Sequence, residues 1–387
     1  MRQRRMAVLT LPIAAAALIF PALRNVGAGE ETNSSGYAVL EPIRSGSLTV
    51  FPVVASKTYV TSQFLTLDEG FRSGEVVVTE YGSASGLVRR PITPVVNQEH
   101  AEVNRLVLIN NSKRPLLLLA GEIVTGGKQD RVIGKDRIVP AESDPIDLSV
   151  FCVESGRWVA SSNHFGASGT TYAANGVGGG NGGGVAAAGT MMAQPSVRSK
   201  VMAEKDQGQV WAEVRKQQSA MSSEVTEAAP TETAATALPP TTSYARVMEN
   251  QSVKEKVDEV AKPIEESYQT LIARLRDRKA VGVVVAVNGR IIWSDIFAST
   301  ELLEKYWPKL VRSYASEVVV QRVKSADATV AQAQAFLADM QGRKETIENE
   351  PGLYRQSEVS GDGFKVFALT SLLPKTGFEV HIAKMAD

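Results

Sequence analysis

The sequence predicts an α+β protein. An N-terminal antiparallel β-sandwich or partial barrel is followed by a helix-rich half with an antiparallel hairpin and a C-terminal three-stranded meander. Short apolar segments separated by turns, about every eight to twelve residues, fill the first half of the chain. Longer stretches with apolar residues at helical spacing dominate the second half. There, Asn288-Gly289 stands between two apolar runs and is the strongest short hairpin signal.

The first half contains short segments with the composition of strands. We expect these strands at residues 48–54, 75–80, 103–110, 116–120, 131–140 and 145–154. Residues 110–115 are polar and end in proline, which favours a hairpin-sized turn between the third and fourth strands.

The second half is expected to combine helices with antiparallel strands. The helices are expected at residues 197–225, 247–277, 299–316 and 326–341. The strands are expected at residues 281–287, 290–296, 353–359, 364–369 and 378–384.

The N-terminus has the layout of an export signal. Arg2, Arg4 and Arg5 precede an apolar stretch at about residues 7–23 and a small-residue end. We expect cleavage, which leaves no stable membrane span. The alternative is a retained anchor, although about 17 residues is near the short limit for crossing a bilayer. The protein is therefore expected to be exported, to a periplasmic, cell-envelope or secreted location.

Composition divides the remaining chain into segments. We expect a signal peptide at 1–28, a polar leader at 29–45, a strand-rich half at 46–165 and a Gly-rich linker at 166–190. A helical insert at 191–225, a disordered Ala/Thr/Pro-rich linker at 222–243 and an α+β half at 244–387 follow.

Charge and cysteine content exclude several classes of function. The chain has 42 basic and 42 acidic residues, and removal of the four arginines in 1–28 leaves an acidic excess of four. This balance gives no support for nucleic-acid binding. Cys152 is the only cysteine, so the chain has no internal disulfide. Three scattered histidines give no zinc spacing, and we expect neither a metal site nor a cofactor. A calcium or magnesium site built from the carboxylates of Glu122, Asp130, Asp136 or Glu154 is the alternative that stays open.

Residues 121–131 are the most informative segment. Directly after an expected buried strand come Gly121-Glu122, then Gly126-Gly127, then four polar residues that end at Arg131. A chain that leaves a core strand in this way normally forms a functional site, or a turn whose backbone must lie close to another group. Asp130-Arg131 recurs six residues later as Asp136-Arg137. The copies either share one strand face or face each other across a bulge at Gly134.

A second polar cluster lies at residues 151–158. Strand alternation places Cys152 and Glu154 on the same face as the apolar residues before them. A buried acid needs a partner, and Arg157, Arg131 or Arg137 could provide one. The pair is either structural or the ligand-facing part of a site, and Cys152 is expected to be a small buried apolar residue.

Together these motifs resemble a known family. Gly121-Glu122-Ile123 with residues 126–131, and residues 151–154 with Gly156-Arg157-Trp158, are similar to the ADP-ribosylglycohydrolase-and-rhodanese-phosphatase-associated protein domain, first type. The likeness extends through residues 282–297 and 303–314 and so covers 46 to about 320. The resemblance implies a link to NAD or ADP-ribose metabolism, inferred from genomic company, and transfers no catalytic residues.

Two functions of different classes follow. The first is a binding module that presents residues 129–137 to an anionic small molecule or a protein partner. The second is a hydrolase of a phosphate- or ADP-ribose-like substrate, with Glu122 or Glu154 as general acid/base and arginine stabilising charge. Binding is favoured, because no nucleophile–base pair is visible. The ligand-binding candidates are Lys128, Gln129, Asp130, Arg131, Asp136, Arg137, Arg157 and Trp158.

Overall fold

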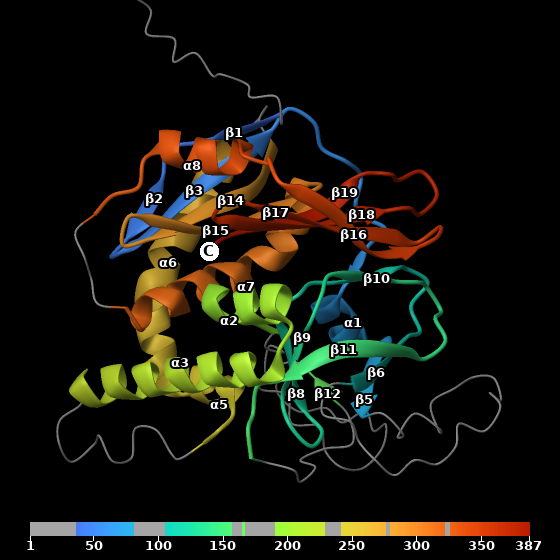
Figure 1. Cartoon of the computed structure of the whole chain (residues 1–387), viewed down its shortest axis with the longest axis horizontal. Coiled ribbons are helices and arrows are strands. Elements are labelled where there is room, and N and C mark those ends of the chain that lie inside the picture. The colour runs from blue at the N-terminus through green and yellow to red at the C-terminus, as the bar shows by residue number, and fades with distance from the viewer. Residues whose placement is uncertain are drawn as a thin grey trace, which may run out of the picture. The chain divides into compact units, whose positions relative to one another are not determined.

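A nine-stranded antiparallel sheet combines strands from both halves of the sequence (Figure 1). The computed structural model describes residues 36–80, 105–156, 165–166, 190–228, 241–275, 279–321 and 326–387. The strands follow the order β1-β3-β14-β15-β19-β18-β17-β16, and β2 pairs with β3. Their bounds are β1 Tyr37–Val39, β2 Ile43–Ser45, β3 Leu48–Ala55, β14 Lys279–Val287, β15 Arg290–Phe297, β16 Arg343–Glu350, β17 Tyr354–Gly361, β18 Phe364–Ser371 and β19 Glu379–Ala386.

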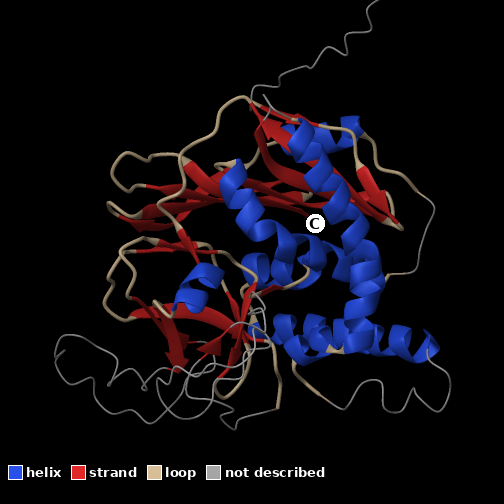
Figure 2. Cartoon of the chain, turned by 180° about the vertical axis from the view of Figure 1, so that it is seen from behind, coloured by secondary structure: helices blue, strands red, loops and turns tan. Residues whose placement is uncertain are grey.

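Strand β3 is covered on both faces, which explains its nearly continuous apolar sequence. Leu48 and Val50 face the larger core, which α6 (Gln251–Arg274) and α7 (Thr300–Val319) cover. Phe51 and Val53 face a second core, which α8 (Val330–Ala338) closes. Figure 2 shows α6 and α7 packed against this sheet. The first expected strand therefore pairs with the C-terminal half, along β14.

Six strands close into a small barrel, as the sequence predicted for the first half. They are β5 Val76–Glu80, β6 Arg105–Asn110, β8 Glu122–Gly126, β9 Arg131–Ile133, β11 Ile146–Cys152 and β12 Phe165–Gly166. Phe165 closes the ring because it pairs with both Val78 of β5 and Gly126 of β8. Leu108, Val124 and other apolar side chains fill its interior. Strand β13 (Met191–Met192) extends the sheet beyond β8.

A third sheet lies between the other two and contains β4 (Leu65–Thr66), β7 (Leu116–Leu118) and β10 (Arg137–Val139). The single strand expected at 131–140 is thus two strands in different sheets. Gly134 separates them: its N–H donates to Ser149 O, and a Cβ atom there would lie 2.9 Å from that oxygen. The two Asp-Arg copies consequently do not share a surface.

The helices also divide where the sequence predicted continuous segments. The expected helix at 197–225 is α2 (Pro195–Ser199), a π-helical turn η2 (Lys200–Glu204) and α3 (Gln207–Ala228). Lys205 separates η2 from α3 with a φ of 54°. The expected helix at 247–277 is α5 (Tyr244–Glu249) and α6, because Asn250 caps α6 through its side chain. Helix α1 (Leu67–Ser73) was not expected and begins with a capping box between Thr66 and Glu69.

The C-terminal meander is confirmed and has one more strand than expected. Strand β16 is mostly exposed and mostly polar in sequence, so it lacks the apolar alternation that marked β17, β18 and β19. The expected signal peptide and most of both expected linkers lie outside the described residues. None of the helices in the described part of the chain has the length and apolar composition needed to cross a bilayer.

Candidate functional site

The chain leaves β7 through a tight, fully buried turn at residues 119–122. Glu122 Oε2 accepts a hydrogen bond from Leu119 N at 2.7 Å, and Asp136 Oδ1 accepts one from Ala120 N at 2.8 Å. Gly121 has a φ of 95°, and a Cβ atom there would lie 2.6 Å from Cγ of Arg198. The turn therefore needs glycine at 121 to pass this close to Arg198, and the two carboxylates accept hydrogen bonds from its buried N–H groups.

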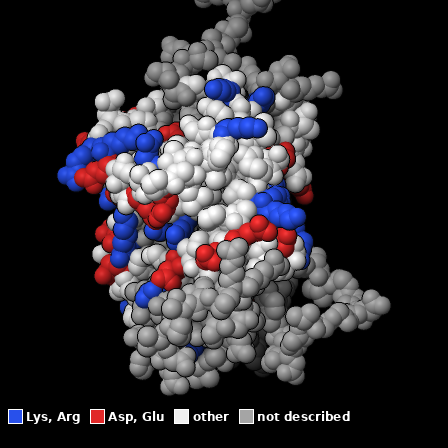
Figure 3. Space-filling model, turned by 90° about the vertical axis from the view of Figure 1, so that its right-hand side faces the viewer, with Lys and Arg blue, Asp and Glu red and all other residues white. Residues whose placement is uncertain are grey.

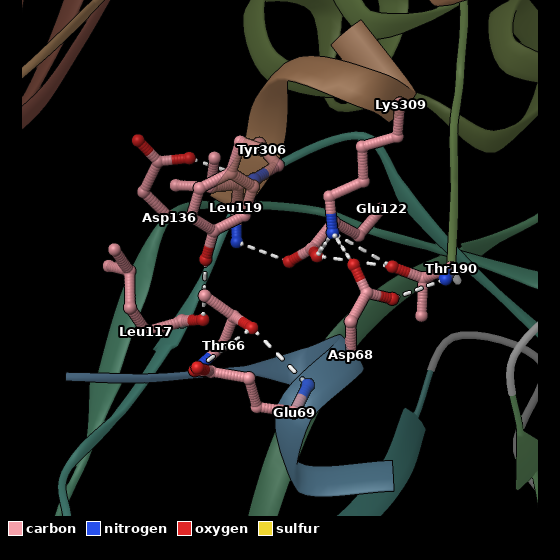
Figure 4. A network of polar contacts seen from close by, with 11 residues as sticks. Thr66, Asp68, Glu69, Leu117, Leu119, Glu122, Asp136, Thr190, Tyr306 and Lys309 are labelled. Atoms are coloured by element: carbon pink, nitrogen blue, oxygen red, sulfur yellow. Dashed lines mark hydrogen bonds and ion pairs between the residues drawn. The ribbon is translucent and has the colours of Figure 1, made fainter. Parts of the chain in front are cut away.

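Glu122 belongs to a buried charge network that joins helices α1 and α7 to strand β8 (Figure 4). Lys309 of α7 places Nζ 2.5 Å from Glu122 Oε1, 2.8 Å from Asp68 Oδ2 and 2.9 Å from Thr190 Oγ1. Thr190 N donates to Asp68 Oδ1 in turn. Lys309 also lies over the Tyr306 ring, 4.6 Å from its centroid. Two carboxylates thus share one ammonium group in the interior.

The network shifts the pKa values of its two carboxylates in opposite directions. Burial raises the pKa of Glu122, and the attraction of Lys309 does not fully offset it. Burial would also raise the pKa of Asp68, but the charge and hydrogen bond of Lys309 outweigh this effect and hold that pKa below its usual value. Burial alone would lower the pKa of Lys309, but the two carboxylates raise it. Lys309 therefore stays protonated, and Glu122 is the carboxylate whose ionised form is disfavoured.

A second buried network centres on Asp295 of β15. Arg198 of α2 binds both oxygens of this carboxylate, at 2.8 and 2.9 Å, in a bidentate pair. Trp293 Nε1 and Tyr314 OH donate to the same carboxylate at 2.9 and 2.5 Å. His381 Nε2 lies 3.1 Å from Asp295 Oδ1. Burial acts to raise the pKa of Asp295, but these cations and donors hold it far below its usual range.

His381 links the second network to the turn at residues 119–122. Its Nδ1 lies 2.6 Å from Asp136 Oδ2, whose other oxygen holds Ala120 N. Burial would lower the pKa of His381, but Asp136 and Asp295 raise it to about 9. A buried imidazolium therefore connects a carboxylate beside β10 with one on β15.

The two sequence motifs meet in a third cluster. Asp130 N donates to Glu154 Oε2 at 3.0 Å, and Gln129 Nε2 donates to Glu154 O at 2.8 Å. Ser243 Oγ donates to Asp130 Oδ2 at 2.5 Å. All four residues are at least nine-tenths buried. Cys152 lies beside them with Sγ 3.0 Å from Glu154 O, and burial raises the pKa of its thiol.

The remaining predicted residues lie apart from one another. Arg131 is fully buried beside the third cluster, opposite Cys152 in the pairing of β9 with β11, whereas Arg137 lies nearer the surface and donates to Asp147 O at 2.8 Å. Lys128 N donates to Glu80 Oε1 at 2.7 Å. Arg157 and Trp158 lie outside the described residues. The structure thus brings Gln129, Asp130, Arg131 and Glu154 together and places Glu122 and Asp136 in two other networks.

Sequence reasoning missed the partners of Glu122 and Asp136. Asp295 and His381 interrupt apolar strands, and Lys309 lies on the apolar face of its helix. A charge at an apolar position indicates a buried pair, so each was recognisable as an anomaly. The pairing was not recognisable, because the partners are tens to hundreds of residues apart in the sequence.

A cleft of about 360 Å³ lies between the barrel and the meander. Its barrel wall is formed by residues 149–151 of β11 and by Gly134 and Lys135, and its other wall by side chains of β16, β17 and β18. Met202 and Lys205 lie at one side. The volume falls in the range of small-molecule sites. Lys135 belongs to residues 129–137, the segment that the sequence singled out, although it was not among the candidates.

Two lysines of the cleft are bound to glutamates that have a second partner. Lys135 pairs with Glu348 Oε2, while Oε1 of the same carboxylate accepts a hydrogen bond from Tyr354 OH at 2.6 Å. Lys205 lies 3.4 Å from Glu358 Oε2, while Lys365 lies 3.3 Å from Oε1. Burial acts to raise the pKa of Glu348, but the bonds from Lys135 and Tyr354 lower it.

Comparison with known proteins adds one finding. The family model described as ARPP-1, the ARG and Rhodanese-Phosphatase-superfamily-associated Protein domain, matches residues 36–384, a wider range than the motifs had indicated. Neither curated proteins nor solved structures gave a match. Among the described residues, no group of three or more His, Cys, Asp or Glu side chains is arranged to hold a metal ion.

Proposed function

The chain belongs to the ARG and Rhodanese-Phosphatase-superfamily-associated Protein domain family, and from its cleft we propose that it is an exported binding protein for a small anionic molecule. The observation that carries this proposal is the pair of cleft lysines, Lys135 and Lys205. Each can pass from its glutamate to a ligand anion while that glutamate keeps another donor. Binding an anion then leaves no partly buried carboxylate without a partner, so the penalty for an unpaired charge is avoided.

The buried networks support the proposal by fixing the two walls of the cleft. Asp136 lies next to Lys135, and its contact with His381 holds this turn of the barrel half against the large sheet. Lys309 likewise ties α7 to Glu122 of β8. Because these contacts are buried and bidentate or multiply bonded, they preorganise the cleft, which lowers the cost of binding. In this proposal Glu122, Asp130, Asp136 and Glu154 hold the fold and do not touch the ligand.

The surface charge fits a small ligand better than a polyanion. On the face drawn in Figure 3, Lys and Arg side chains are interleaved with Asp and Glu, and neither sign forms a continuous patch. Extended polyanions are bound by continuous basic surfaces. A small anion needs only the local charge that two lysines provide.

Calorimetric titration of the purified protein with benzoate, hexanoate and phenyl phosphate tests the proposal. We expect at least one anion to bind, more weakly at high salt because the lysines are partly exposed. The double variant Lys135→Met/Lys205→Met should bind at least tenfold more weakly. A matched control is Lys216→Met/Lys262→Met, which removes two exposed lysines that also pair with acids. Equal binding by both double variants, or no binding of any anion, refutes the proposal.

Export is proposed from the sequence and needs its own test. Residues 1–28 have the layout of a signal peptide. Cell fractionation of the expressed full-length chain should recover a shortened form outside the cytoplasm, and mass spectrometry should place its new N-terminus near residue 28. Recovery of the uncut chain in the cytoplasm refutes export while leaving anion binding open to its own test.

One observation favours a hydrolase as the second candidate. The raised pKa of Glu122 is the property that a general acid needs. Its side chain is fully buried, however, and both oxygens already accept hydrogen bonds. Hydrolysis of ADP-ribose to AMP and ribose 5-phosphate, lost in Glu122→Gln but kept in Lys205→Met, would establish this alternative. Absence of turnover leaves the binding function.

A further inference from the structure

We infer that the cleft binds a planar aromatic carboxylic acid with an O–H or N–H donor opposite its carboxylate; this inference rests on the proposed function and makes it more specific. Three side chains of the cleft each define the position of one part of the ligand. Lys205 provides the carboxylate position, Phe367 the aromatic position and Gln356 the donor position.

The carboxylate position follows from what Lys205 already binds. Its ammonium group pairs with the Glu358 carboxylate at 3.4 Å and is half exposed, so it can turn toward a ligand. The same ammonium lies 5.9 Å from the centroid of the Phe367 ring. An acid bound to Lys205 therefore has its carbon body next to Phe367. Because Phe367 is almost fully buried and fixed, an aromatic body would pack against the part of its ring that lines the cleft at low entropic cost.

The donor position follows from an unsatisfied acceptor. Gln356 lines the cleft with only 1% of its surface exposed, and its Oε1 accepts no hydrogen bond within the described part of the chain. A buried acceptor without a donor is unfavourable and rare in native proteins. A hydroxyl or N–H group of a ligand in the cleft would donate the missing hydrogen bond to Gln356 Oε1.

Strand geometry sets the distance between the two ends of the ligand. Gln356 and Glu358 lie two residues apart on β17, so they share one face at a separation of roughly 7 Å. Glu358 pairs directly with Phe367 on β18, which puts the aromatic position on the same face. A benzene ring with para substituents can extend along this face from Lys205 to Gln356.

A bulge in β16 adds apolar surface on the donor side. Thr346 pairs with Ser357 and Glu348 with Gln356, so Ile347 has no partner residue in the ladder. Ile347 lines the cleft and is 37% exposed. Bulges re-aim side chains next to sites, and a ligand in the cleft would cover this isoleucine.

Calorimetric titration with four matched probes tests the inference on the purified protein. The probes are 4-hydroxybenzoate, benzoate, methyl 4-hydroxybenzoate and trans-4-hydroxycyclohexanecarboxylate. Compared with 4-hydroxybenzoate, benzoate lacks the donor, the methyl ester lacks the negative charge and the cyclohexane acid lacks the planar ring. We expect 4-hydroxybenzoate to bind at least tenfold more tightly than each of the others.

Two variants connect these preferences to the residues. Gln356→Leu should bind benzoate as the wild type does and should lose the preference for 4-hydroxybenzoate. Its Tm should stay equal or rise, since the substitution removes an unsatisfied acceptor. Lys205→Met should lose affinity for every acid by at least tenfold, whereas Lys216→Met should not.

The outcomes separate the inference from the proposed function. Equal binding of 4-hydroxybenzoate and benzoate overturns the donor position, and equal binding of the cyclohexane acid overturns the aromatic position. In both cases an anion still binds through Lys205, so the proposed function stands. If no acid binds the wild-type protein, both are overturned.

Discussion

Nδ1 of His381 lies 2.6 Å from Oδ2 of Asp136, across the boundary between the large sheet and the three-stranded sheet. This contact makes the stability of the fold depend on pH. The pKa of His381 is about 9 in the folded protein against an ordinary value of 6.5. Its stabilising contribution is therefore complete below about pH 6.5 and is lost as pH rises through 9.

We predict that the free energy of unfolding contains a term from His381 that falls by up to about 3 kcal/mol between pH 6.5 and 9.5. Lys384 acts in the opposite direction, because burial lowers its pKa from 10.5 to about 8 and stability then rises from pH 8 to 10.5. Urea denaturation of the wild type and His381→Gln at several pH values isolates the term, since Lys384 is common to both. Parallel curves for the two proteins would contradict the prediction.

Lys309→Met should destabilise the protein by about 3–5 kcal/mol, because it leaves Glu122 and Asp68 buried without their cation. Urea denaturation at pH 7 measures the change. Addition of Glu122→Gln to Lys309→Met should recover part of the loss, because one uncompensated charge is then removed.

The control for this pair is Lys216→Met, which removes an exposed lysine and should change stability by less than about 0.5 kcal/mol. Equal effects of Lys309→Met and Lys216→Met would mean that the buried network does not form.

Gly121→Ala should cost more than Gly156→Ala, although the two glycines have nearly the same φ, 95° and 94°. Both substitutions carry the conformational cost of a positive φ, about 1 kcal/mol or more. Only at Gly121 would the new Cβ meet another side chain, at 2.6 Å from Arg198, whereas nothing lies within 4 Å at Gly156. Overpacking should add about 1–3 kcal/mol.

Thermal and urea denaturation of the two glycine variants compare these costs. A smaller loss in Gly121→Ala than in Gly156→Ala would show that Arg198 does not pack against the turn.

Cys152 should be unreactive toward an aromatic disulfide reagent in the folded protein. Its side chain is fully buried, and burial raises the pKa of the thiol, so little thiolate is accessible. Absorbance of the released thiolate should show no labelling without denaturant and one thiol per chain in urea, since the chain has a single cysteine. Labelling of the native protein within minutes would contradict the burial of Cys152.

Local pattern was enough to predict most of the fold. The β14–β15 hairpin, α7 and the β17–β19 meander follow from a turn dipeptide, helical spacing and strand alternation, all of which act between near neighbours. The polar strand β16 and the two-residue strands were missed, because their pairing partners define them and their own composition does not.

The candidate site was only partly accessible from the sequence. Residues 121–131 and 151–154 were singled out from unusual polarity after buried strands, and Asp130 does contact Glu154. Gln356, Lys205 and Phe367 carried no such anomaly. A glutamine on a strand acquires meaning only when its oxygen is buried in a cleft without a donor.

The sequence by itself determined the fold class, the family and the segments where charge enters the core, because composition and spacing express local conformational preference and burial. Only the tertiary structure decided which charges pair and where a cavity remains. Lys309 with Glu122, and His381 with Asp136, are 187 and 245 residues apart. Such contacts depend on how whole sheets and helices pack, and the cleft between barrel and meander is the space that this packing leaves unfilled.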